Sequence, residues 1–199
     1  NGEYYMKKID TFSANSLKLL DKSVLEFENK YLYNLSIMKK DKRAILGQKF
    51  HNLICFYIKN FDVSKLILNL TQDEQKSWQK LKDYLKDKKD DFIKTEYSFL
   101  IKEKLNSKPY FLTGRFDAVY KKDGFYVIYD WKTLNIPKNP KDDLQSIVYL
   151  FCANKIFKTD KIKLKYLSIE KLDSFEIPFI NPDYYKEKLD KIILKHFIK

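Results

Sequence analysis

The N-terminal part of the chain carries apolar side chains every three or four positions, the spacing of amphipathic helices. A first helix is predicted over residues 13–35, where Ser13 provides an N-cap. A second is predicted over residues 42–59. A third begins at the capping-box sequence Thr71-Gln-Asp-Glu74. We expect these three helices to cover the core.

The pattern changes near residue 95, where aromatic and β-branched residues become frequent. Three runs of this kind cover residues 95–102, 110–120 and 124–133. Asp123-Gly124 lies at the junction of the last two runs, as in a tight hairpin turn. The pattern therefore predicts three strands in succession, the last two forming a hairpin.

Two Asn-Pro pairs punctuate the rest of the chain. Asn139-Pro140 combines a helix cap with a proline suited to the first helical position, and predicts a helix that ends near Phe157. Residues 161–170 and 174–179 are predicted strands, and Asn181-Pro182 opens a last helix. This order predicts an α/β fold: a central mixed β-sheet flanked by helices, with a helical N-terminal part.

The domain organisation predicted from this order is a single domain over residues 1–199, without a linker. Its helical part covers residues 6–90, its sheet core 91–180 and its C-terminal helix 181–199. We expect residues 1–5 to be an artificial extension ahead of a natural start at Met6.

The charge is strongly positive, with 39 Lys and Arg against 27 Asp and Glu and a net charge of +12. Such a surface favours a polyanionic partner such as nucleic acid. However, only Arg43 and Arg115 are arginines. This excess of lysine is typical of an AT-rich genome, so charge alone leaves a protein without a nucleic-acid role equally open.

The composition also argues against a membrane-spanning protein and against a four-cysteine metal site. No apolar run approaches the roughly 18 residues that cross a bilayer, and we expect no membrane association. Cys55 and Cys152 are too few for a four-cysteine metal site and are predicted to be buried free thiols. A reducing, cytoplasmic location is expected.

The candidate chemistry lies on the predicted hairpin. Asp130 and Lys132 are two apart on one strand and share a face, and pairing about the turn brings Asp117 near Asp130. Two adjacent carboxylates repel unless a cation compensates, and Mg²⁺ prefers such hard oxygen ligands. A lysine beside the metal can hold or polarise a water molecule. The alternative is an exposed hairpin with ordinary surface charges.

Four short motifs extend this pattern along the chain. In chain order they are Gly47-Gln-Lys-Phe-His51, Gly114-Arg-Phe-Asp117, Asp130-Trp-Lys-Thr133 and Gln145-Ser-Ile-Val-Tyr149. In these motifs and their order the sequence resembles the PD-(D/E)xK nuclease superfamily and, within it, the RecB-type nuclease domains. The resemblance covers residues 12–170 and includes the runs "FSANSLKLL" and "TEYSFL".

The resemblance implies a restriction-endonuclease-like core and a role for each motif. Asp117, Asp130 and Lys132 would be catalytic. His51, which alone is more often an ordinary core or surface residue, would join the two aspartates and the carbonyl of Trp131 as a metal ligand. Gln145 and Tyr149 would position the nucleic acid and Lys132, whereas without the resemblance they read equally well as a helix flank. Glu96 is a weaker candidate for supporting the site.

Two features of related domains are missing from the sequence. Many RecB-type members carry a four-cysteine iron–sulfur cluster, and Cys55 and Cys152 cannot supply it, so no cluster is expected. No glycine-rich nucleotide-binding loop of a helicase motor occurs either. The chain would therefore act alone or with a helicase or recombination partner; its oligomeric state stays open.

The function implied is Mg²⁺- or Mn²⁺-dependent hydrolysis of DNA, as an exonuclease on DNA ends or single strands in repair or recombination. The alternative from another class is a catalytically silent module on the same fold that binds nucleic acid or acts as a scaffold. A degenerate module would usually lose an acid or the lysine, and this chain keeps Asp117, Asp130 and Lys132.

Overall fold

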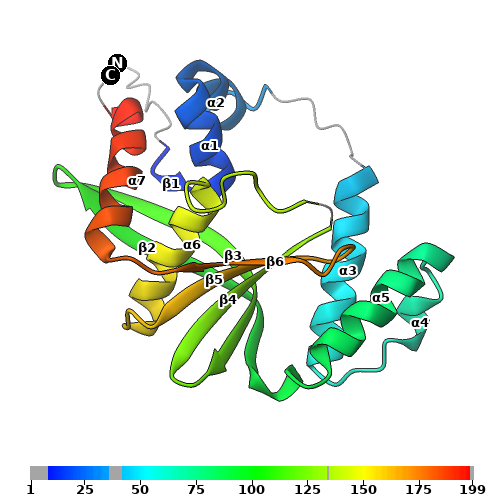
Figure 1. Cartoon of the computed structure of the whole chain (residues 1–199). Helices are drawn as coiled ribbons and strands as arrows, with labels where there is room; N and C mark the ends of the chain where they lie inside the picture. Colours follow the sequence, from blue (N-terminus) through cyan, green and yellow to red (C-terminus); the bar gives the residue numbers. More distant parts are fainter. Residues whose placement is uncertain (1–8, 36–41, 134, 198–199) are drawn as a thin grey trace.

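The computed structural model describes residues 9–35, 42–133 and 135–197, with the backbone alone described at 42–44. A central sheet separates two groups of helices (Figure 1). This arrangement confirms the predicted α/β fold with a mixed sheet flanked by helices. The expectation about residues 1–5 lies outside the described residues.

The sheet has six strands in its described part, and β3 is the strand that joins most of them. β3 pairs antiparallel with β2 along most of its length and antiparallel with β4 near its end. β1 and β3 run parallel, as do β4 and β5, and β6 closes the far edge antiparallel to β5. The strands are β1 (Thr11–Phe12), β2 (Phe92–Leu105), β3 (Lys108–Lys122), β4 (Phe125–Lys132), β5 (Ile162–Ser168) and β6 (Ser174–Pro178).

Helices cover both faces of this sheet (Figure 1). The helices on one face are α1 (Ala14–Lys22), α2 (Val24–Tyr31), α6 (Leu144–Phe157) and α7 (Pro182–Phe197). Those on the other face are α3 (Lys42–Ile58), α4 (Ser64–Ile67) and α5 (Gln72–Leu85). None of the helices in the described ranges is both long enough and apolar enough to span a membrane.

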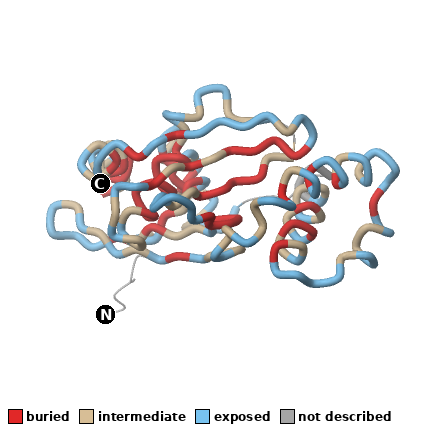
Figure 2. Tube along the Cα trace, turned by 60° about the horizontal axis from the view of Figure 1, so that its bottom comes forward, coloured by how far each residue is buried: buried red, intermediate tan, exposed pale blue. Residues whose placement is uncertain are grey.

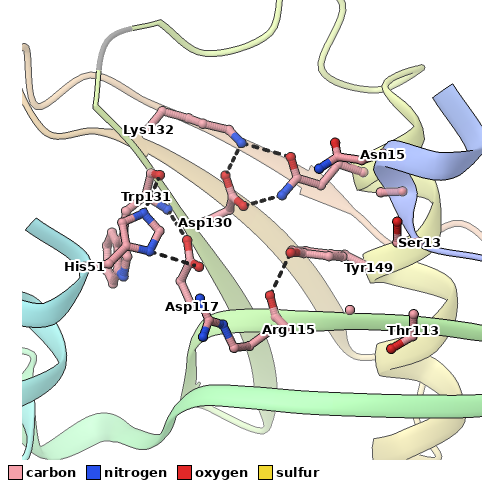
Figure 3. Close-up of a pocket in the computed structure, with 13 residues that line it drawn as sticks. Ser13, Asn15, His51, Thr113, Arg115, Asp117, Asp130, Trp131, Lys132 and Tyr149 are labelled. Carbon is pink, nitrogen blue, oxygen red and sulfur yellow. Dashed lines mark hydrogen bonds and ion pairs between the residues drawn. The ribbon is translucent and has the colours of Figure 1, made fainter. Parts of the chain in front are cut away.

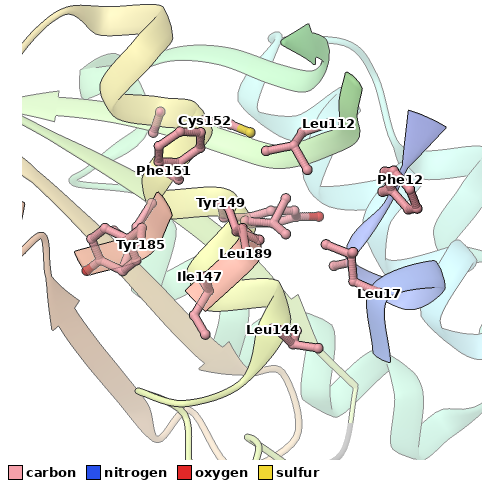
Figure 4. Packing of buried hydrophobic residues seen from close by; sticks show 14 of the residues in the cluster. Phe12, Leu17, Leu112, Leu144, Ile147, Tyr149, Phe151, Cys152, Tyr185 and Leu189 are labelled. Carbon is pink, nitrogen blue, oxygen red and sulfur yellow. The ribbon is translucent and has the colours of Figure 1, made fainter. Parts of the chain in front are cut away.

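Each face of the sheet has its own hydrophobic core, and buried residues lie both in the central strands and in the helices packed on them (Figure 2). The larger core joins α1, α6 and α7 to the sheet around Leu17, Leu112 and Leu189 (Figure 4). The smaller core joins α3 and α5 to Trp131 and its neighbours. Because burying one large apolar side chain contributes about 1.5–3 kcal/mol, these two cores supply most of the stabilisation.

The predicted helix over residues 13–35 is two helices. Ser23 has extended backbone angles and separates α1 from α2. Its hydroxyl accepts a hydrogen bond from the backbone N–H of Glu26, so Ser23 caps α2. A serine within an apolar stripe can therefore restart a helix in a new direction.

The predicted start of α6 at Asn139-Pro140 is wrong. The helix begins at Leu144, and Asp143 caps it by accepting a hydrogen bond from the N–H of Gln145. Lys18 of α1 forms an ion pair with Asp143 at 2.9 Å. Pro140 instead lies in the preceding turn, where its carbonyl accepts a hydrogen bond from Ser146 Oγ. These tertiary contacts favour the later cap.

The other predicted elements agree with the structure within a few residues, including the capping box at Thr71. The strand β1, the helix α4 and the short 3₁₀ helix η1 (Lys89–Asp91) were not predicted. Cys152 is buried as predicted. Cys55 is only partly buried, so this part of the prediction is wrong; its Sγ lies 3.3 Å from the hydroxyl of Thr95 on β2.

Gly114 allows β3 to pack closely against an aromatic ring on β2. Its ladder partner is Phe99, and a Cβ at residue 114 would lie 2.6 Å from Cζ of that ring. Phe99 cannot move freely, since its ring packs against those of Phe116 and Tyr149. Residue 114 therefore has to be glycine for this packing to persist.

We predict that Gly114→Ala lowers the free energy of unfolding by about 1–3 kcal/mol through overpacking, as measured by urea denaturation. Adding Phe99→Leu to Gly114→Ala should recover part of the loss, because the smaller side chain leaves room for the methyl group. Unchanged stability of Gly114→Ala would show that the ring moves aside without cost.

Candidate active site

The site forms where β3 has no strand partner on one of its two sides. On that side β3 pairs with β1 at residues 111–112 and with β4 from residue 118. Residues 113–117 lie between these two ladders, and within the described chain no strand pairs with them there. The diverging strands β1, β3 and β4 thus open a cavity in the plane of the sheet.

Asp117 and Asp130 lie at the point where β3 and β4 separate. The last pair of their ladder is Ala118–Tyr129, so the two aspartates are the next residues in register. Asp117 Oδ2 accepts a hydrogen bond from the backbone N–H of Trp131 at 2.8 Å. A carboxylate therefore satisfies a backbone donor that β3 no longer reaches, which fixes Asp117 at the cavity.

The backbone of β2 is irregular directly opposite Asp117. The β2–β3 ladder pairs Thr95 with Ala118 and Tyr97 with Phe116, and it skips Glu96 and Asp117. Glu96 has a φ of 51°, in the left-handed region that disfavours residues with a Cβ. Such strain is retained where the surrounding structure requires it, often at functional sites. Here it accompanies a carboxylate that faces the site.

His51 reaches Asp117 and the backbone of Trp131 from α3, on the other side of the cavity (Figure 3). Its Nδ1 lies 3.3 Å from Asp117 Oδ1, and its Nε2 lies 3.3 Å from the carbonyl oxygen of Trp131. One turn earlier on α3, a Cβ at Gly47 would lie only 3.2 Å from Thr133 Oγ1. Gly47 thus lets the helix approach the end of β4 closely enough for His51 to make both contacts.

Lys132, Asp130 and Gln145 form one hydrogen-bonded network (Figure 3). Lys132 Nζ lies 2.7 Å from Asp130 Oδ2 and donates to Gln145 Oε1 at 2.9 Å. The amide nitrogen of Gln145 donates to Asp130 Oδ1 at 2.6 Å. The ammonium group also lies 5.2 Å from the ring centre of Tyr166, a cation–π contact. The lysine is therefore held in one position by three neighbours.

Tyr149 and Arg115 complete the wall of the cavity along β3. The hydroxyl of Tyr149 donates to the backbone carbonyl of Arg115 at 2.7 Å, which satisfies a second backbone group in the gap beside β3. The guanidinium of Arg115 lies 2.9 Å from Glu96 Oε2, and Glu96 Oε1 lies 4.0 Å from His51 Nδ1. Glu96 is thus shared by two basic side chains.

The cavity bounded by these residues has a volume of about 450 Å³. It extends from the Asp130–Lys132 end past Arg115 to the start of α1, where Ser13 and Asn15 line it. A space of this size suits a ligand of nucleotide dimensions.

The electrostatics of the cavity follow from burying like charges together. Burial raises the pKa of Asp130, and the neighbouring charge of Asp117 raises it further, to about 7 despite the opposing effect of Lys132. Burial lowers the pKa of His51, but the hydrogen bond and charge of Asp117 outweigh it, so this pKa lies above its ordinary value. Without a ligand, the site therefore retains protons that ordinary Asp and His residues release.

The donor atoms suit a divalent cation with a preference for oxygen. The ligating atoms of His51, Glu96 and Asp117 all lie within 4.8 Å of one another. The carbonyl of Trp131 adjoins His51, and Asp130 is the next acid in register but is turned toward Lys132 and Gln145. Carboxylate and carbonyl oxygens with one imidazole fit Mg²⁺ or Mn²⁺.

All residues singled out from the sequence for the site line one cavity. They are His51, Asp117, Asp130, Trp131, Lys132, Gln145 and Tyr149. Glu96, considered only a weak candidate, stands directly beside His51 and Asp117. The sequence reasoning did not assign Asn15, Thr113 or Arg115 to the site. For Arg115 a signal existed, since it is one of only two arginines.

Known proteins resemble the chain in sequence and in fold. A family model described as the PD-(D/E)XK nuclease superfamily matches residues 11–198. A crystal structure described as that of SSO0001 aligns with a TM-score of 0.53 and 18% identity, covering 96% of this chain and 78% of that chain. At that identity the likeness concerns the fold alone. No curated protein sequence matches the chain.

The two raised pKa values predict how the stability of the metal-free protein depends on pH. Asp130 binds its proton more tightly in the folded state, so its contribution to stability is lost as pH rises from its unfolded pKa toward about 7. The raised pKa of His51 acts in the same direction, with loss as pH rises through the folded value. The melting temperature should therefore fall by several degrees between about pH 5 and pH 7.5.

Asp130→Asn should remove most of this fall and raise the melting temperature at pH 7.5, because it removes the buried charge. Saturating Mn²⁺ should stabilise the parent more at pH 7.5 than at pH 5, where protons compete for the same ligands. A parent whose melting temperature is constant over this range, or an Mn²⁺ effect independent of pH, would contradict the assignment. Differential scanning calorimetry at constant ionic strength measures both.

Proposed function

Since the chain belongs to the PD-(D/E)XK nuclease superfamily, we propose that it is a divalent-metal-dependent nuclease that hydrolyses phosphodiester bonds of DNA. The observation that carries the proposal is the cavity itself: two buried aspartates, a histidine and a fixed lysine meet in one polar space. Burying Asp117 and Asp130 together costs stability, and a structural role alone does not account for it.

In this proposal Asp117, Asp130, His51 and the carbonyl of Trp131 hold a Mg²⁺ or Mn²⁺ ion. The bound ion would supply Lewis-acid stabilisation of the charge that develops on the phosphate. Glu96 is a further carboxylate within reach of the same position. To bind the metal ion, Asp130 would give up part of its contact with Lys132. The ammonium of Lys132 and the metal ion would then compete for the same buried carboxylate.

Lys132 would orient or activate the attacking water. Its ammonium lies against Asp130, so a water molecule bonded to Lys132 would stand beside the metal ligands. Gln145 accepts from Lys132 and donates to Asp130, so it acts as a positioning residue for both. Tyr149 would act indirectly, through the Arg115 carbonyl that borders the cavity.

We further propose that the chain is related to the RecB-type nuclease domains. It would act as an exonuclease on DNA ends or single strands, in repair or recombination. The four ordered motifs support the subfamily, and the net charge of +12 supports binding to a nucleic-acid backbone. The cavity has room for one nucleotide of a strand, and the resemblance to RecB-type domains supports single-stranded ends as the substrate.

We predict cleavage of labelled single-stranded DNA with Mg²⁺ or Mn²⁺ and none with a chelator. Asp130→Ala and Lys132→Ala should each lower the cleavage rate about 100-fold or more, since each removes a group acting on the reacting atoms. Lys191→Ala, at an exposed position on α7, is the matched control and should cleave like the parent.

The pattern of outcomes separates the alternatives. Binding without cleavage by the parent would favour a silent nucleic-acid-binding module. Neither binding nor cleavage would favour a protein without a nucleic-acid role. If Lys132→Ala cleaved as fast as the parent, the role given to Lys132 would be wrong.

A further inference from the structure

Arg115 is a cationic side chain at the rim of the cavity that the mechanism above does not use. It lies two residues before Asp117 on β3, about 7 Å along the strand. Its side chain is 48% exposed, whereas that of Glu96, its ion-pair partner, is 23% exposed. Arg115 thus faces the solvent from which a substrate would arrive, beside the residues proposed to bind the metal (Figure 3).

The choice of arginine at this position is informative because the chain otherwise uses lysine. The sequence has 39 Lys and Arg, and only Arg43 and Arg115 are arginines. A lysine would suffice for a simple ion pair with Glu96. A guanidinium differs in offering a planar fork of N–H donors that matches two oxygens of a carboxylate or a phosphate at once.

The structure fixes the backbone of Arg115 and leaves its side chain able to exchange partners. The backbone is held by the hydrogen bond from Tyr149 to the Arg115 carbonyl and by pairing with Ser98 on β2. The ion pair with Glu96 is partly exposed, and such pairs add little net stability. A phosphate, which accepts the same two-pronged donor, can therefore displace Glu96 at little cost.

Glu96 is placed to release the guanidinium without being left unpaired. Its second oxygen lies 4.0 Å from His51 Nδ1, and its ligating atoms adjoin those of Asp117. Its positive φ holds the carboxylate between the arginine and the proposed metal position. When the arginine leaves, the carboxylate thus still faces cationic partners.

We propose that Arg115 binds a backbone phosphate next to the one that is cleaved, and that Glu96 holds the guanidinium in place until the nucleic acid takes it over. This inference rests on the proposed function, because it requires a nucleic-acid strand in the cavity. It makes Arg115 a substrate-binding residue and Glu96 its competitor in the free protein.

The test is the affinity for a labelled 12-nucleotide single-stranded oligonucleotide, measured by fluorescence anisotropy. Ca²⁺ replaces Mg²⁺, and gel electrophoresis verifies that the oligonucleotide stays intact. Arg115→Gln should weaken binding about 10-fold and lower the salt slope by about 1, as expected for one lost phosphate contact. Arg115→Lys, which keeps the charge but not the fork, should lose less.

Lys102→Gln is the matched control for charge. Lys102 is exposed on β2, about 20 Å along the strand from Glu96, and its loss should change affinity less than about twofold. Equal melting temperatures of all variants would verify that each is folded. If Arg115→Gln and Lys102→Gln weakened binding equally, Arg115 would be only one surface charge among many and the inference would fail.

A double-mutant cycle tests the exchange itself. Glu96→Gln should tighten binding several-fold, because it frees the guanidinium. In the Arg115→Gln background the same substitution should have no such effect. If the tightening persisted there, it would reflect general removal of negative charge, and the competition between Glu96 and phosphate would be excluded.

These measurements keep the two proposals distinguishable. If the parent cleaves DNA and Arg115→Gln binds like the parent, the inference about Arg115 fails and the proposed function stands. If the parent neither binds nor cleaves the oligonucleotide, the proposed function fails and the inference falls with it.

Discussion

The burial of Asp117 and Asp130 in one cavity is the constraint on which the rest of the site depends. Their like charges repel in a place that water hardly reaches, since Asp130 is 3% exposed and Asp117 7%. Every polar neighbour offsets that cost. Lys132 and Gln145 hold Asp130, while the N–H of Trp131 and the ring of His51 hold Asp117. These neighbours offset only part of the repulsion between the two aspartates, and the pKa of Asp130 stays raised.

The fold creates this site because the pairing between β3 and β4 ends before the two aspartates. β3 and β4 separate after Ala118 and Tyr129, and the backbone groups released there are satisfied by site side chains. Asp117 accepts from the N–H of Trp131, and Tyr149 donates to the carbonyl of Arg115. Residues of the site are therefore also parts of the sheet, so loss of activity in a variant needs a parallel measurement of stability before it is assigned to chemistry.

Local signals in the sequence predicted most of the fold, because caps, turns and residue periodicity act within a few residues. The hairpin at Asp123-Gly124 and the cap at Thr71 are of this kind, and both are present. The predicted start of α6 was wrong because two local capping signals, Asn139-Pro140 and Asp143, compete there. Lys18, distant in sequence, stabilises the later cap at Asp143. The role of Glu96 could not be predicted from local signals either. Its proximity to His51 depends on the β2–β3 register and on its positive φ, and the hydrophobic pattern of a strand specifies neither.

The charges around the cavity connect metal binding to substrate binding. Three carboxylates, of Glu96, Asp117 and Asp130, face the cationic side chains of Lys132 and Arg115, together with His51. Because these charges nearly cancel, a divalent cation adds excess positive charge unless His51 loses a proton or an anion arrives with it. A phosphate supplies that anion, so each ligand should favour the other, and such coupling is reciprocal. In the proposed function, the positive charge of the whole chain would attract nucleic acid, and the nearly neutral cavity would bind cation and phosphate more tightly together than either alone.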